Sequence, residues 1–224
     1  IAQGLQSQVS DIEGNVSTLQ QTAQGLQSSI TNLRDEFDNL EIGGRNLLIN
    51  SDFKNGTTGW TSSQITQGHT TGFNGAVVER SGYDGTSRRF FQQQNNAESG
   101  REVILAGETY TLSGWFYIDS SIPLDGTSNQ FIIRKYQSGN SGTFQDVTTF
   151  TVNLSSHEYD KWYYFETTGK VRDGYTGREF VAFALEKNGR VIVSGLKLEK
   201  SHKATPWTPA PEDINAHPFV VELA

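Results

Sequence analysis

The first 40 residues carry apolar side chains at alternating steps of three and four. Two sets of positions, each repeating every seven residues, hold them: Ala2, Val9, Val16, Ala23, Ile30 and Phe37 in one set, and Leu5, Ile12, Leu19, Leu26, Leu33 and Leu40 in the other. An average spacing of 3.5 residues is the heptad repeat of left-handed coiled coils. A seam this narrow is buried only by another helix. The pattern therefore predicts a coiled-coil stalk over residues 1–42, in which copies of the chain associate.

The seam residues leave the number of copies open. Valine or isoleucine in the first set with leucine in the second favours two strands, but Ala23 and Phe37 depart from that preference. Dimer and trimer therefore both fit. The outer positions include Gly4, Gly14 and Gly25, and a glycine in a helix interior costs about 1 kcal/mol. We expect the isolated helix to be weak, so burial of the seam must stabilise it.

After a hinge predicted at residues 43–45, the apolar period changes from 3.5 to 2. Paired glycines at the hinge suit a helix end. The following runs alternate like strands and are separated by turn pairs such as Asp-Gly and Asn-Gly. Ten strands are predicted, at residues 46–50, 60–67, 76–80, 88–93, 109–119, 130–137, 144–153, 161–169, 179–187 and 190–199. The fold class is therefore mainly β, with a jelly-roll β-sandwich over residues 46–200.

The last segment, residues 201–224, is predicted to be an extended tail. It has three prolines between positions 206 and 211, and proline neither donates a backbone hydrogen bond nor continues a helix. We expect Trp207 to fold back against the sandwich as a clasp.

Strand alternation identifies six candidate ligand-binding residues. Each of three strands places two of them on one face: Trp115 and Tyr117, Arg134 and Tyr136, Trp162 and Tyr164. Flat rings beside polar groups suit the C–H faces and hydroxyls of a sugar. The alternative is that these rings pack in the core or under loops. Convergence of the rings at the surface would favour a binding site.

Composition excludes several other functions. The formal net charge is -7 at pH 7, which opposes binding to nucleic acid or to an anionic membrane. There is no cysteine, and the four histidines lack the spacing of metal ligands. No apolar run approaches the ~18 residues of a membrane span. We predict no catalytic residue, metal or cofactor, because the carboxylates before glycines are explained by turns.

Two motifs resemble a known family. Residues 46–53 (NLLINSDF), followed by Gly59 and Trp60, are similar to the opening segment of carbohydrate-binding-module-like jelly rolls in tail proteins of bacteriophages, notably those of Gram-positive hosts. Residues 194–200 (SGLKLEK) and 204–213 (ATPWTPAPED) resemble the closing segment. Some members hold a structural calcium, often with an acidic residue in the final strand. Ser194 stands at that place here, so we predict no metal.

A heptad stalk before such a domain also resembles phage tail fibres and receptor-binding proteins, which are usually homotrimers. The resemblance implies an extracellular virion component that binds host cell-wall or capsular saccharide without catalysis. By this likeness its partners would be copies of itself, in a homotrimer, and other tail proteins. Two alternatives fit the same residues: a structural spacer or trimerisation module without sugar binding, and a polysaccharide hydrolase or lyase, since two suitably spaced carboxylates are all a glycosidase needs.

Overall fold

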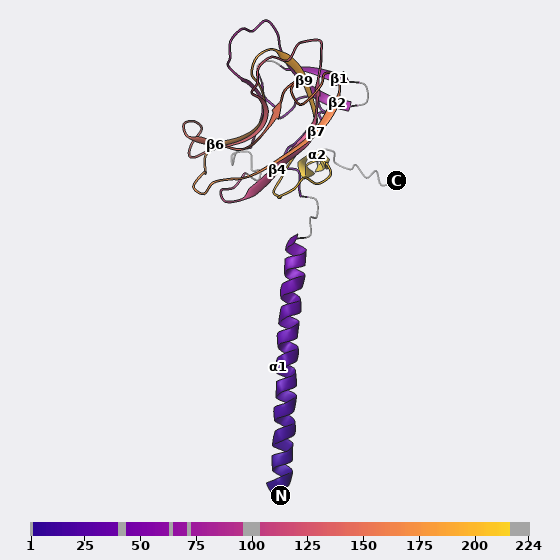
Figure 1. Cartoon of the computed structure of the whole chain (residues 1–224), viewed down its shortest axis with the longest axis vertical. Helices are drawn as coiled ribbons and strands as arrows, with labels where there is room; N and C mark the ends of the chain where they lie inside the picture. Colours follow the sequence, from indigo (N-terminus) through magenta and orange to yellow (C-terminus); the bar gives the residue numbers. More distant parts are fainter. Residues whose placement is uncertain (1, 40–43, 63–64, 71–72, 96–103, 216–224) are drawn as a thin grey trace, which may run out of the picture. The chain divides into compact units, whose positions relative to one another are not determined.

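The computed structural model describes residues 2–39, 44–62, 65–70, 73–95 and 104–215, and the chain divides into two units, Ile1–Ile42 and Gly43–Ala224 (Figure 1). The first unit is helix α1 (Ala2–Asn39), so the predicted helix is confirmed. Its large apolar seam residues are exposed within the single chain, from 47% at Val16 to 69% at Leu19. Association of copies stays a prediction. The side chains of seam residues Ala2, Leu33 and Phe37, and all of Leu40, lie outside the described part.

The second unit is a sandwich of two antiparallel sheets (Figure 1). One sheet has five strands in the order β1-β2-β9-β4-β7, and the other has four in the order β3-β8-β5-β6. The strands are β1 (Ile65–Thr70), β2 (Phe73–Arg80), β3 (Arg89–Asn95), β4 (Thr109–Ile118), β5 (Asn129–Tyr136), β6 (Phe144–Val152), β7 (Trp162–Lys170), β8 (Glu179–Leu185) and β9 (Gly189–Glu199). The predicted fold class is confirmed.

Alternate residues of the strands meet between the two sheets and form the core. On β4, Leu112, Phe116 and Ile118 are fully buried. The ring of Phe131 on β5 stacks on that of Phe165 on β7, with centroids 3.9 Å apart. Each such side chain contributes about 1.5–3 kcal/mol through burial. The neighbours of these residues along each strand consequently point to the outer face of their sheet.

One polar pair interrupts this apolar core. Lys135 on β5 and Glu179 on β8 are both buried, with Lys135 Nζ 2.5 Å from Glu179 Oε2. Burial raises the pKa of the Glu179 carboxyl, and the hydrogen bond and charge of Lys135 oppose that rise. Removing one partner of such a pair would leave the other charge buried and uncompensated.

The prediction of a strand at residues 46–50 is wrong. This segment forms bends and turns, and Asn46 supplies through its side chain the partners that a ladder would provide. Asn46 Oδ1 accepts hydrogen bonds from the backbone N–H groups of Leu48 and Leu198, at 3.0 and 3.2 Å. Leu47 and Leu48 are buried all the same, which is why the sequence looks like a strand. The strand predicted at 60–67 also differs, because β1 begins only at Ile65 and Thr61 forms an isolated bridge with Gln92.

A bulge distorts the pairing of β4 with β9. Ser113 pairs with Lys197 and Trp115 with Ser194, so β9 holds two residues where β4 holds only Gly114. One of the two, Gly195, has a φ of 56°, a left-handed conformation that glycine adopts without strain. Bulges of this kind redirect neighbouring side chains, and this one lies beside Trp115.

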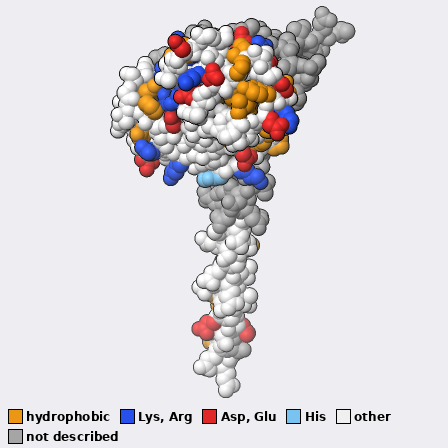
Figure 2. Space-filling view, turned by 45° about the horizontal axis from the view of Figure 1, so that its top comes forward, with side chains coloured by type: hydrophobic (Ala, Val, Ile, Leu, Met, Phe, Trp, Pro, Cys, Tyr) orange, Lys and Arg blue, Asp and Glu red, His pale blue; other side chains and the backbone are white. Residues whose placement is uncertain are grey.

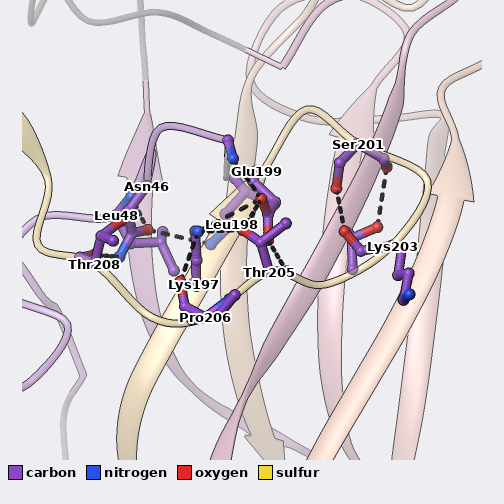
Figure 3. Close-up of polar contacts among 12 residues, drawn as sticks. Asn46, Leu48, Lys197, Leu198, Glu199, Ser201, Lys203, Thr205, Pro206 and Thr208 are labelled. Carbon is purple, nitrogen blue, oxygen red and sulfur yellow. Dashed lines mark hydrogen bonds and ion pairs between the residues drawn. The ribbon is translucent and has the colours of Figure 1, made fainter. Parts of the chain in front are cut away.

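The tail returns across β9 and is fixed there by polar contacts (Figure 3). The ammonium of Lys197 donates to Thr205 Oγ1 and to the carbonyl of Pro206. The tail is not extended throughout, because residues Pro211–Asn215 form a short helix, α2, that begins with proline at its first position. Residues 216–224 lie outside the described part.

Candidate functional site

Four of the six candidate residues meet on the outer face of the five-stranded sheet. The antiparallel register of β4 and β7 sets Trp115 opposite Tyr164 and Tyr117 opposite Trp162. The ring centroids of the two pairs are 5.4 and 5.5 Å apart. We call these four residues the aromatic ladder. Such cross-strand aromatic pairs are a usual element of sheet stability, so their burial decides whether they are also available to a ligand.

The aromatic ladder is open to solvent. Trp115 is 38% exposed and Tyr164 is 47% exposed, while Tyr117 and Trp162 are half-buried. Phe116, between Trp115 and Tyr117, and Phe165, next to Tyr164, fill the core instead. The rings of the ladder therefore do not pack between the sheets. Hydrophobic side chains also gather in patches between charged groups on the face of the domain seen in Figure 2.

One carboxylate, that of Asp160, fixes the end of the ladder formed by Tyr117 and Trp162. Asp160 accepts hydrogen bonds at Oδ1 from the hydroxyl of Tyr117, at 3.2 Å, and from the backbone N–H of Ser120, at 3.1 Å. Hydrogen bonds from Ser120, with a smaller contribution from Tyr117, lower the pKa of Asp160. Burial, followed by the charge of Asp160, raises the pKa of Tyr117. At neutral pH the phenol therefore stays protonated and donates to an ionised carboxylate, which orients its ring.

The other two candidates lie on the other sheet. Arg134 and Tyr136 are on the outer face of the four-stranded sheet, on β5. Arg134 is only 7% exposed, and its Nε and Nη2 atoms contact the two carboxylate oxygens of Asp146 at 2.6 and 3.0 Å. Its guanidinium also lies 3.9 Å from the ring centre of Phe144. Arg134 is thus already paired within the protein, and the structure does not bring it together with the aromatic ladder.

Sequence reasoning missed the aromatic residues around Arg134 and the place where the Trp207 segment contacts the sandwich. Phe90 and Phe180 come from β3 and β8, and their ring centres are each 5.6 Å from the Arg134 guanidinium. Phe144 is opposite Tyr136 in the pairing of β5 with β6. Only the register of strands distant in the sequence brings these residues together. Trp207 carried a signal, three neighbouring prolines, which pointed to a clasp but not to its position.

Two features considered from the sequence, a metal site and a membrane span, can be compared with the structure. Among them, no three or more His, Cys, Asp or Glu side chains are grouped so that they could hold a metal ion. Ser194 instead donates its hydroxyl proton to the backbone carbonyl of Asn74. None of the helices in this part of the chain is long and apolar enough to cross a membrane.

Comparisons with known proteins identify the fold. No model of a protein family matches the chain, and no curated protein matches it either. A xylan-binding domain of carbohydrate-binding module family 22 superposes with a TM-score of 0.50 at 12% identity, covering 72% of this chain and 98% of that domain. The C-terminal family 22 module of Clostridium thermocellum Xyn10B gives 0.48 at 13% identity, over 69% of this chain and 94% of that module.

One of the matching structures is a phage protein. The enzymatically active domain of bacteriophage CBA120 tailspike protein 4 matches with a TM-score of 0.44 at 12% identity, covering 69% of this chain and 21% of that one. At such identities the likeness extends to the fold alone. The second unit of this chain thus has the β-sandwich fold found in carbohydrate-binding modules.

Proposed function

We propose that this chain is a segment of a bacteriophage tail fibre that binds host cell-wall or capsular saccharide in several copies and without catalysis. In this proposal the aromatic ladder holds the sugar, and the α1 seam joins three chains. The protein would be part of the virion and act outside the cell.

The exposed aromatic ladder is the observation that carries this proposal. Two rings with more than a third of their surface open, on neighbouring strands of a rigid sheet, form an apolar platform for the C–H groups of a pyranose. Asp160 and the exposed Glu166 supply acceptors for sugar hydroxyls at the margin of the ladder. A solved domain with this fold is described as xylan-binding, so a polysaccharide is a suitable class of ligand to test.

The α1 seam supports the proposal of several copies. Seven large apolar residues of the seam are exposed in one chain: Leu5, Val9, Ile12, Val16, Leu19, Leu26 and Ile30. Each gains about 1.5–3 kcal/mol when another helix covers it. Linked copies would also compensate for a weak single site, since avidity can exceed the affinity of one site by roughly 10² to 10⁴. The choice of three copies rests on the likeness to tail fibres.

A glycan array probed with the intact protein tests the binding function. We expect Trp115→Ala and Tyr164→Ala each to reduce the signal on the preferred glycan by about tenfold, because each removes a stacked ring. Phe144→Ala is the matched control, since this ring is 44% exposed but lies on the other sheet. It should leave binding unchanged.

The array and an incubation with polysaccharide separate the alternatives. If the wild-type protein binds no glycan and no host cell-wall preparation, the chain is a structural spacer or trimerisation module. If incubation with polysaccharide instead produces new reducing ends, it is a hydrolase or lyase.

A further inference from the structure

We propose that Trp207 of the tail extends the aromatic ladder, so that the site takes a linear neutral oligosaccharide lying across the strands. This inference rests on the proposed function. The position of Trp207 follows from Gly195, the glycine of the β9 bulge. A methyl group placed on Gly195 would lie 3.7 Å from Cδ1 of Trp115 and 4.0 Å from Cδ1 of Trp207. The two indoles therefore flank the same glycine, and apart from its chain neighbours no other side chain lies within 4 Å of that methyl position.

The three rings define a direction across the sheet. Tyr164 is on β7 and Trp115 is opposite it on β4. Gly195 is on the next strand, β9, with Trp207 beside it. Neighbouring strands are about 4.8 Å apart, so Tyr164, Trp115 and Trp207 run perpendicular to the strands. A platform of this length contacts several sugar units of a chain, and a monosaccharide would cover only part of it. The acidic groups at its margin, Asp160 and Glu166, disfavour an anionic sugar.

Hydrogen bonds hold the tail on both sides of Trp207 (Figure 3). The carbonyl of the preceding residue, Pro206, accepts from Lys197 Nζ at 3.0 Å. The carbonyl of the following residue, Thr208, accepts from Asn46 Nδ2, also at 3.0 Å. The indole itself donates from Nε1 to Ser51 Oγ at 3.2 Å. A ring held by its own hydrogen bond and by bonds to the residues on either side loses little conformational freedom when a ligand binds.

A buried polar network fixes the start of this segment. Thr205 donates from its backbone N–H to Glu199 Oε1 and from its hydroxyl to Glu199 Oε2, both at 2.8 Å. The same hydroxyl accepts from Lys197 Nζ at 2.6 Å, and Gly44 N donates to Glu199 Oε2 at 3.0 Å. Lys197 and Glu199 are fully buried. Buried charges are stable only with their partners in place, so these contacts hold the tail where it passes β9. Thr205 is thus a positioning residue for Trp207.

Fluorine NMR of the intact protein labelled with 5-fluorotryptophan tests this inference. The chain has four tryptophans, and single Trp→Phe variants assign their signals. The probes are xylohexaose, cellohexaose and chitohexaose, each with its monosaccharide. We expect a hexasaccharide to shift the signals of Trp115 and Trp207 together. Trp60 is the internal control, because it is buried and stacks on Phe91 with centroids 4.8 Å apart. Its signal should not move.

Affinity measurements on variants complete the test. We expect Trp207→Ala to weaken hexasaccharide binding about five- to tenfold, the loss of one ring contact, and Trp207→Phe to retain most of it. Neither should alter monosaccharide binding. Thr205→Val should change the Trp207 signal and weaken hexasaccharide binding, while the Trp115 signal still responds.

Two results would overturn the inference in different ways. If Trp115 responds to a hexasaccharide but Trp207 does not, and Trp207→Ala binds normally, Trp207 is only a clasp and the proposed function stands. If neither tryptophan responds to any of the three hexasaccharides, both the extended site and saccharide binding at the ladder are contradicted.

Discussion

Within a single chain, the stalk leaves its large apolar residues exposed, whereas the sandwich buries residues of the same kinds. Leu19 and Leu26 of α1 are more than half exposed, whereas Leu112 and Leu198 of the sandwich are fully buried. The sandwich buries its apolar residues between two sheets of one chain. The helix has one narrow stripe, which only another helix can cover. A single copy therefore suffices to bury the core of the sandwich, whereas we propose that the stalk buries its stripe by association with other copies.

The largest expected effect comes from placing charge in the stalk seam. The double change Ile12→Asp and Leu19→Asp would put two carboxylates per chain at the centre of a multi-stranded core, where their desolvation is not compensated. We expect complete dissociation to chains of 24.8 kDa, measured by light scattering, with the sandwich still folded. Ser10→Asp with Ser17→Asp is the matched control, because these residues are on the outer face. If the seam variant keeps the mass of the wild type, the seam is not the interface.

The next effect belongs to the sandwich alone. Lys135→Met leaves the Glu179 carboxylate buried without its partner and should lower the free energy of unfolding by about 3–5 kcal/mol. Adding Glu179→Leu removes the unpaired charge and should restore most of that loss. Denaturant unfolding followed by tryptophan fluorescence measures both. A loss below about 1 kcal/mol for Lys135→Met would mean that water reaches this pair.

Replacing glycine with alanine should stabilise the stalk but destabilise the sandwich. A methyl group on Gly4, Gly14 or Gly25 meets nothing within 4 Å, so each change to alanine should stabilise the stalk by about 1 kcal/mol per chain. Gly195→Ala should destabilise the sandwich by about 1 kcal/mol, because φ is 56° there. Thermal melts followed by circular dichroism at the helix band and by tryptophan fluorescence separate the two. If alanine changed stability in the same direction in both regions, either the helical stalk or the strained conformation of Gly195 would be contradicted.

The smallest effect is a pH dependence confined to the sandwich. The pKa of Glu179 is raised above its ordinary value of 4.5, so the folded state retains a proton that the unfolded state has released. Between 4.5 and the raised pKa, stability therefore falls as pH rises. Glu179→Gln does not titrate, and the wild type should lose stability relative to it across this window. A stability difference that stays constant or grows with pH would contradict the raised pKa.

Local periodicity made much of this fold predictable, and long-range pairing limited the rest. The heptads of α1 and the alternation of Trp115 with Phe116 are visible within a few residues. The false strand at residues 46–50 arose because burial without ladder pairing leaves the same apolar pattern. Alternation also predicted that Trp115 and Tyr117 share one strand face and that Arg134 and Tyr136 share another. It could not predict that the two pairs lie on different sheets. That outcome depends on topology, which contacts between distant segments determine.

Light scattering on the intact chain in solution shows whether copies are joined along the seam, which both the proposed stalk and multivalent binding require. We expect a mass three times the 24.8 kDa of one chain. A mass of one chain at micromolar concentration would contradict it.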